Sequence, residues 1–383
     1  MTISESNWLQ TAWSEAEAAV LRTARRIGGG FPHVVLNGRY DEREPEWWTA
    51  GFWPGLLWLV DLEHPELQLA ERAARCEEQL GAVLDDPEKV DHDLGFIWLL
   101  SGVASYRATG HADSRRRALL AANLLAARYN VTGAFIRAWN FPSPFMDTRG
   151  VAIIDSMMNL PLLYWATEET GDPRYAALAV RHANTVAETF VREDRSIRHV
   201  VEFDLSSGNM QREHGGQGFG AGSAWARGTS WALHGFALAY GYTGDLRHLA
   251  IAENTADFFL EELGGEAVPC WDFRAPSGHR EAWDSSAAAI AASGLLELER
   301  YSARGEHYGA AARNLVRRLH EDYTQRDGDS EGILTHGTVH YPEQLYVNHS
   351  IIYGDYFYVE SLAKLRGHQG LFRVTTSLCS DRP

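Results

Sequence analysis

Strongly apolar segments alternate with amphipathic segments along most of the chain. The apolar ones are GFWPGLLWLV (51–60), GFIWLLSGVASY (95–106), MMNLPLLYWA (157–166), WALHGFALAY (231–240) and AAAIAASGLLEL (287–298). The segments that follow carry charges on one face, as in RHANTVAETFVRE (181–193). A helix that is apolar all round is buried, whereas an amphipathic helix covers the surface. The pattern therefore predicts buried inner helices, each followed by an outer helix.

Short turns separate each inner segment from its outer segment. A glycine directly after a helix suits the left-handed C′ position, and an aspartate in the turn can cap the next helix. The turn glycines are Gly110, Gly171, Gly244 and Gly305, the capping candidates are Asp172 and Asp245, and Glu63-His64-Pro65 forms an earlier turn. About six such hairpins predict a single all-α domain over 1–383, an (α/α)6 barrel. An α-solenoid is the alternative, although it would not usually carry so apolar an inner layer.

Long connections must return each outer helix to the next inner helix. They run roughly over 130–149, 193–223, 263–283 and 322–350, and they are rich in Gly, Pro, Asn and aromatic residues. Loops of this length inside a compact domain usually serve function. We therefore expect the functional residues at the end of the ring where these connections lie.

Polar and aromatic residues gather in the first turns of the predicted inner helices. They are Trp47, Trp48, His92, Asp93, Asp155, Arg227, Trp231, Asp284, Ser285 and Asp355. Because all inner helices begin at the same end of the ring, we expect these side chains to converge on one mouth. Helix capping alone could explain Asp93 or Asp284. It does not explain Asp155, which lies among Ile and Met in the predicted helix, where an unpaired carboxylate is costly.

Two carboxylates that share a pocket can divide acid and base roles. Burial and a charged neighbour keep one of them protonated while the other stays ionised. Asp93 and Asp155 fit this pattern. A helix N-terminus opposes it, because its dipole favours the ionised form. The direction of either pKa shift therefore stays open at the level of sequence.

Composition excludes some classes of partner. The formal net charge of −16 argues against nucleic acids and anionic membrane surfaces. Thirteen Trp and 15 Tyr residues offer flat faces suited to sugars. The three cysteines suggest neither a disulfide framework nor a CxxC metal site. No signal peptide or membrane-spanning run is evident. We expect a cytoplasmic protein without a cofactor or catalytic metal.

Several sequence blocks resemble unsaturated glucuronyl hydrolases, glycoside hydrolase family 88. The blocks are WWTAGFWPGLLW (47–58), DHDLGFIWL (91–99), RAWN (137–140), DTRGVAIIDSMMNLPLLYWA (147–166), SIRHVVEFD (196–204), QGFGAGSAWARGTSWALHGFALAY (217–240), DSSAAAIAASGLLEL (284–298) and YGDYFYVE (353–360). They span about residues 45–360 in family order, and the resemblance weakens after about residue 362.

The resemblance implies an (α/α)6 barrel and a particular reaction. Such enzymes act on oligosaccharides that polysaccharide lyases leave with a C4=C5 double bond in the uronic acid at the non-reducing end. They add water across this vinyl ether, and the resulting hemiketal falls apart to release the uronic acid. Ordinary glycosidases instead attack the glycosidic bond with two carboxylates.

The resemblance also implies roles for individual residues. Asp155 would be the general acid and base, and Asp93 the second essential carboxylate. The residues implied to bind the sugar or position the water are Trp48, Trp139, His199, Gln217, Arg227 and Trp231, and His92 would orient Asp93. For several of them the sequence leaves structural roles open, such as an ion pair between Arg227 and Asp284.

Three other functions compete with this interpretation. Unsaturated rhamnogalacturonyl hydrolases, family 105, share the fold and chemistry but take pectin-derived substrates. Sugar epimerases on an α/α ring use paired histidines, whereas the candidates here are carboxylates. A non-catalytic carbohydrate-binding ring would need the tryptophans but not Asp155. The sequence leaves open the sugar attached to the uronate and the oligomeric state.

Overall fold

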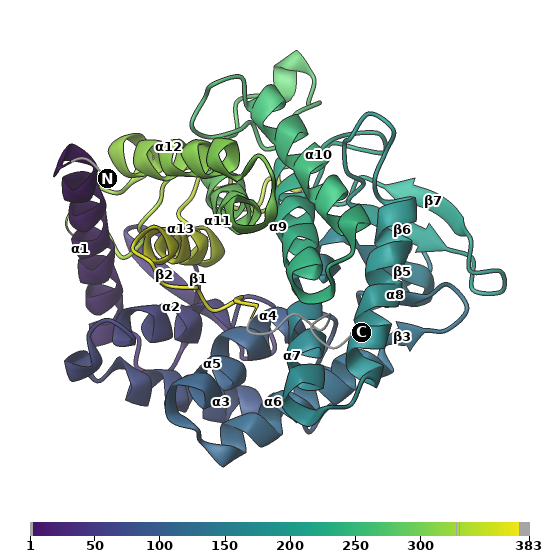
Figure 1. Cartoon of the computed structure of the whole chain (residues 1–383), viewed down its shortest axis with the longest axis horizontal. Coiled ribbons are helices and arrows are strands. Elements are labelled where there is room, and N and C mark those ends of the chain that lie inside the picture. The colour runs from purple at the N-terminus through teal and green to yellow at the C-terminus, as the bar shows by residue number, and fades with distance from the viewer. Residues whose placement is uncertain (1–2, 327, 329, 375–383) are drawn as a thin grey trace.

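A computed structural model describes residues 3–326, 328 and 330–374, and within them the chain is mostly helical (Figure 1). Six helical runs correspond to the predicted inner layer. They are α2 (Phe52–Asp61), α4 (Leu94–Trp98) continued by a π-helical turn (Leu99–Val103) into α5 (Ala104–Thr109), α7 (Leu160–Thr170), α9 (Ala226–Thr243), α11 (Ser285–Tyr301) and α13 (Ile352–Leu365). The outer helices are α1 (Ile3–Arg26), α3 (Leu69–Val83), α6 (Ala112–Ala127), α8 (Arg174–Thr189), α10 (Leu246–Leu263) and α12 (Gly305–Tyr323).

Contacts between the inner helices run in chain order and return to the start. The run α4–α5 contacts α2 and α7, α7 contacts α9, α9 contacts α11, and α13 contacts both α11 and α2. Each outer helix packs on the inner helix that precedes it, and α1 packs on α13 (Figure 1). The inner helices are apolar because they face one another and the outer layer. No helix in the described part of the chain is both long and apolar enough to cross a membrane.

Three of the four predicted glycine turns are confirmed. Gly110, Gly171 and Gly244 follow α5, α7 and α9 with φ of 72°, 72° and 65°. The prediction for Gly305 is wrong, because this residue begins α12. A Cβ at Gly305 would lie 2.4 Å from the carbonyl oxygen of Glu299, so close packing against α11 requires the glycine. Asp245 caps α10 by accepting a hydrogen bond from the backbone N–H of Arg247.

The long connections fold into small antiparallel sheets, which the all-α prediction missed. Their strands are β1 (Phe31–Leu36) with β2 (Arg39–Arg43), β3 (Tyr129–Asn130) with β4 (Phe135–Ile136), and β5 (Val151–Ile153) with β6 (Val200–Phe203) and β7 (Met210–His214). The third sheet corrects the expectation that Asp155 lies in an inner α-helix. Instead, β5 leads into a 3-10 helix, Ile154–Met158, which precedes α7. Backbone pairing to β6 holds this segment extended as far as Ile153, two residues before Asp155.

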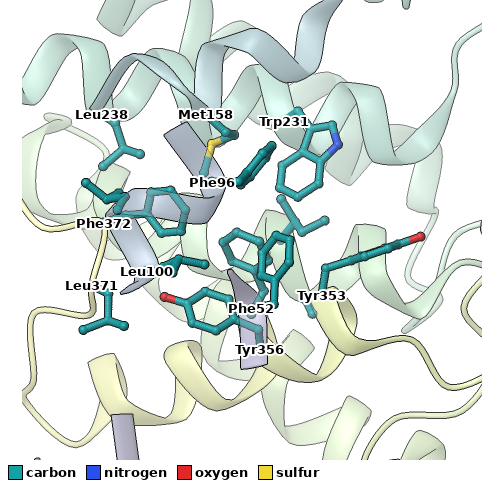
Figure 2. Packing of buried hydrophobic residues seen from close by; sticks show 14 of the residues in the cluster. Phe52, Phe96, Leu100, Met158, Trp231, Leu238, Tyr353, Tyr356, Leu371 and Phe372 are labelled. Atoms are coloured by element: carbon teal, nitrogen blue, oxygen red, sulfur yellow. The ribbon is translucent and has the colours of Figure 1, made fainter. Parts of the chain in front are cut away.

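The C-terminal segment fills the interior of the helical ring. Phe372 is fully buried and packs against Phe96, Tyr356 and Phe357 (Figure 2). The buried carboxylate of Glu360 accepts a hydrogen bond of 3.0 Å from the backbone N–H of Leu371. The segment after 362, where the family resemblance weakens, is therefore part of the core as far as residue 374. Cys76 and Cys270 are buried free thiols, and Cys379 lies outside the described residues.

Replacing Phe372 with alanine tests whether the C-terminal segment stabilises the core. Removing a fully buried phenylalanine leaves a cavity and typically costs about 3–5 kcal/mol. We expect Phe372→Ala to lower the free energy of unfolding by that amount, measured by urea denaturation. The control is Phe145→Ala, because Phe145 is 78% exposed and its loss should change stability little. Equal effects of the two substitutions would contradict a stabilising role of Phe372 in the core.

Candidate active site

Asp155 lies at the junction between a strand and a helix. The backbone N–H of Ile154 donates to the carbonyl of His199, at 3.0 Å, which joins the turn to the segment leading into β6. The Asp155 side chain is buried, with 7% of its surface exposed. Its Oδ2 lies 3.5 Å from Nε2 of His199 and has no hydrogen-bond partner among the described residues. The carboxylate thus stays available to a ligand.

His199 faces Asp155 with its Nε2. Its Nδ1 lies 2.9 Å from the backbone nitrogen of Gln217 and 3.2 Å from the carbonyl oxygen of Gly215. The shorter contact is with an N–H donor, so we assign Nδ1 as the acceptor and place the proton on Nε2. Gly216 makes this approach possible, because its φ is +56° and an added Cβ would lie 2.3 Å from Nδ1. The assigned tautomer directs an N–H toward the Asp155 carboxylate.

Asp93 precedes α4 and is the second buried carboxylate. Its Oδ1 accepts a hydrogen bond of 3.2 Å from Nδ2 of Asn159, and its Oδ2 lies 3.5 Å from Nε2 of His92. Burial raises the pKa of Asp93 well above its usual range, and the negative charges of Asp91 and Asp155 raise it further. Burial also lowers the pKa of His92 to about 3. His92 is therefore neutral near pH 7 and supplies no positive charge to Asp93, and the charge of Arg128, which lowers the pKa of Asp93, does not outweigh burial.

A close contact between two segments brings the carboxylates together. The side-chain oxygen of Asn159 accepts a hydrogen bond of 2.8 Å from the backbone N–H of Phe96. At Gly95, an added Cβ would lie 2.2 Å from Cα of Asn159. A larger residue would push against backbone, which cannot move aside as a flexible side chain can. Gly95 thus allows the turn that carries Asp155 to rest directly on the helix that begins after Asp93.

Arg227 is committed to protein partners. Its Nη1 donates to Oδ2 of Asp284 at 2.5 Å and to the carbonyl oxygen of Thr338 at 2.7 Å. Its Nη2 donates to Oε1 of Gln217 at 2.5 Å and to the carbonyl oxygen of Val339 at 2.7 Å. Arg227 is 1% exposed. The ion pair with Asp284, which the sequence left open, is present, and the guanidinium fixes the Gln217 side chain.

Aromatic rings connect these polar groups. Trp48 is half-buried and packs against Tyr353 at 5.0 Å between ring centroids, and Tyr353 lies under the Arg227 guanidinium. Trp225 contacts both the His199 ring, at 4.2 Å, and the guanidinium, at 4.5 Å. Trp139 is half-buried, stacks on Phe141, and packs on the small cluster that contains Ile153 and Val200.

Trp231 lies deeper than the other predicted site residues. It is fully buried and contacts Phe96 and Phe357 in the aromatic core (Figure 2). Asp355 is also set apart from the carboxylate pair. It accepts hydrogen bonds from the backbone N–H groups of Ile333 and Leu334 and from the Tyr40 hydroxyl. Asp355 therefore anchors the β1–β2 hairpin rather than facing Asp155.

One series of contacts runs from Trp48 through Tyr353 to Arg227, Gln217, His199 and Asp155. Asp93 contacts Asn159 and His92, and the charge of Asp155 acts on it. The sequence analysis missed Asn159, Trp225 and Tyr353. Asn159 lies four residues after Asp155 in the same apolar block, 147–166. A second polar residue in such a block could have indicated a contact at the site. The contacts of Trp225 and Tyr353 depend on how α9 and α13 face each other, which no local pattern reveals.

Comparison with known proteins decides the family. The chain is 36% identical over 375 residues to the unsaturated glucuronyl hydrolase of Bacillus sp. (strain GL1), covering 94% of this chain and 98% of that protein. The chain belongs to the unsaturated glucuronyl hydrolase family. It is accordingly a glycoside hydrolase. A scan of models of protein families finds none that matches the chain.

The solved structure of that same protein and one further relative agree with this family membership. The crystal structure of the Bacillus sp. GL1 unsaturated glucuronyl hydrolase, described as responsible for the degradation of glycosaminoglycan, aligns with a TM-score of 0.90 at 35% identity, covering 95% of this chain and 99% of that one. The unsaturated chondroitin disaccharide hydrolase of Streptococcus pyogenes serotype M1 is 33% identical, covering 83% of this chain and 80% of that protein.

The raised pKa of Asp93 makes stability depend on pH in this glucuronyl hydrolase. Above the unfolded pKa of ~3.9 the unfolded chain has lost this proton, whereas the folded protein still holds it. Folding stability therefore falls as pH rises toward the folded pKa, by up to about 1.4 kcal/mol per pH unit from this group. Asn cannot ionise, so we expect Asp93→Asn to gain stability over the wild type across that window. Urea denaturation at a series of pH values measures the difference, and parallel curves would contradict the raised pKa.

Proposed function

We propose that this enzyme hydrates the C4=C5 double bond of an unsaturated uronic acid at the non-reducing end of a lyase-generated oligosaccharide, and thereby releases that sugar. The observation that carries the proposal is the pair of buried, interacting carboxylates, Asp155 and Asp93, beside His199. A vinyl ether needs a proton donor at carbon and a positioned water, and such a pair supplies both functions. Family membership supports the same chemistry.

The proposed reaction begins with proton transfer from Asp155 to C4. The electron pair of the double bond forms the new C4–H bond, and positive charge develops at C5 and the ring oxygen. The ionised Asp155 then accepts a proton from water as the water oxygen bonds to C5. The resulting hemiketal opens, the ring C–O bond breaks, and the C1 hemiacetal that forms loses the remaining saccharide. Overall, one water is consumed and Asp155 regains its proton.

Asp93 supports Asp155 through charge. After burial and the charge of Asp91, the negative charge of Asp155 also raises the pKa of Asp93. We propose that the active form of the site carries a proton, so turnover falls as the pH rises. Neutral His92, at 3.5 Å, orients Asp93 without supplying positive charge.

The remaining predicted residues divide between contact and support. We assign His199 and Gln217 to the water and the uronate, and half-buried Trp48 and Trp139 to the sugar faces. The four hydrogen bonds that occupy Arg227 favour an indirect role, in which it holds Gln217 in place. Trp231 is fully buried, which favours a role as the packed base of the site.

The substrate class and architecture belong to the same proposal. The names of the relatives favour uronates attached to glycosaminoglycan fragments such as chondroitin disaccharides over pectin-derived sugars. We infer that the closed sequence of inner-helix contacts is an (α/α)6 barrel formed by one domain, and that the protein acts in the cytoplasm without a metal or other cofactor.

An unsaturated uronyl disaccharide tests the activity directly. Hydration destroys its conjugated chromophore, so the ultraviolet absorbance should fall, whereas binding or epimerisation would leave it unchanged.

Asp155→Asn tests the proton donor. Asn keeps the shape of the side chain but cannot donate a proton to carbon. General acid–base catalysis contributes ~10²–10⁴-fold, and Asp155 is assigned both transfers, so we expect kcat to fall by at least ~10⁴-fold with substrate binding largely kept. Wild-type product formed in heavy water should carry deuterium at C4.

A matched control uses another buried aspartate at the start of an inner helix. Asp355 is 1% exposed and bonds to the backbone of residues 333 and 334. Asp355→Asn should reduce stability while the folded fraction keeps its kcat. Substantial turnover by Asp155→Asn, or product without deuterium at C4, would assign the proton transfer to another group.

A further inference from the structure

A buried histidine on an outer helix contacts the turn that carries Asp155. His182 lies on α8 and is fully buried. Its Nε2 lies 2.6 Å from Oγ of Ser156, the residue that follows Asp155. Its Nδ1 accepts a hydrogen bond of 2.9 Å from the backbone N–H of Ile136 in β4. The imidazole therefore spans the space between β4 and the Ile154–Met158 turn.

The direction of each hydrogen bond follows from the one fixed donor. Because the backbone N–H of Ile136 can only donate, Nδ1 of His182 is the acceptor and Nε2 carries the proton. Nε2–H then donates to Ser156 Oγ, and the hydroxyl donates to the carbonyl oxygen of Ile153 at 2.6 Å. Burial lowers the pKa of His182 to about 3, so the neutral form required by this chain is present at neutral pH.

The position of Asp155 depends on this turn because its side chain is held weakly. Its Oδ2 has no hydrogen-bond partner in the described part of the chain, and the 3.5 Å from Nε2 of His199 is too long for a firm hydrogen bond. The carboxylate direction is therefore set by the backbone. The end of β5 and the bond from Ile154 to His199 fix the turn before Asp155, and Asn159 fixes it on α4. Between these points, Ser156 is held by His182.

We propose that His182, acting through Ser156, is a positioning residue that holds the Asp155 carboxylate in its reactive orientation. The inference rests on the proposed function of Asp155. It assigns a role in turnover to an outer-helix residue that does not contact the carboxylates. A misplacement of about 1 Å can reduce a rate ~100-fold, so loss of this support should act on kcat.

The test compares two amide substitutions and a serine substitution. Gln can place an N–H near the position of Nε2 and keep the bond to Ser156. Asn reaches only the position of Nδ1, so it can keep the Ile136 contact but loses Ser156. We expect His182→Asn and Ser156→Ala each to lower kcat ~10- to 100-fold with KM changed less than threefold. His182→Gln should retain most of the wild-type kcat.

The double variant Ser156→Ala/His182→Asn separates positioning from general damage. If both residues act through one hydrogen bond, the double variant should lose about as much kcat as either single variant does. Independent effects would instead give the product of the two single losses. The matched control is His248→Asn on α10, because His248 is also fully buried and its Nε2 bonds to Asn184 at 3.1 Å. This control should lose stability but keep kcat.

Two kinetic outcomes would overturn the inference. They are a kcat of His182→Asn equal to that of the wild type, and multiplicative losses in the double variant. A crystal structure of His182→Asn gives a reading independent of turnover, since the separation of Asp155 Oδ2 and His199 Nε2 should change from 3.5 Å. An unchanged separation would also contradict it. An inactive wild type would instead reject the proposed function, while the crystal structures would still decide whether His182 positions Asp155.

Discussion

The contact of the Ile154–Asn159 segment with the start of α4 is the constraint on which the site depends. Gly95 permits the backbones to meet, and the Asn159 amide bonds to the Phe96 N–H and to Asp93 at once. This single junction sets the separation of two carboxylates that come from different helical hairpins. Their mutual charge, and hence the raised pKa of Asp93, follows from that separation and from burial.

The surroundings of Asp93 make its ionisation unfavourable. Arg227, the fully buried cation of this region, is neutralised by Asp284 and directed to two carbonyl groups and Gln217. The neighbouring His92 stays neutral because its burial opposes protonation. Burial therefore favours the protonated form of Asp93, although the positive charge of Arg128 opposes it.

The two ends of the inner helices have different tasks. Arg227 lies in the first turn of α9, Asp93 and Asp155 lie just before α4 and α7, and the long connections add His199, Gln217 and Trp139 from the β5–β6–β7 sheet and nearby loops. Further along, the interior is filled by aromatic rings and by Phe372 from the C-terminal segment (Figure 2).

The sequence by itself determined the helical repeat and the long connections, and it singled out Asp93 and Asp155 as candidates, because hydrophobic period and the cost of an isolated buried charge are local properties. It did not determine that Asp155 follows a strand, since β5 forms only by pairing with β6 almost 50 residues away. Only the tertiary structure decided that Arg227 pairs with Asp284, that Trp231 lies in the core, that Asn159 bonds to Phe96 and Asp93, and that His182 contacts Ser156. Each of these depends on how separate hairpins face one another, and the distances involved are set by packing rather than by residue type.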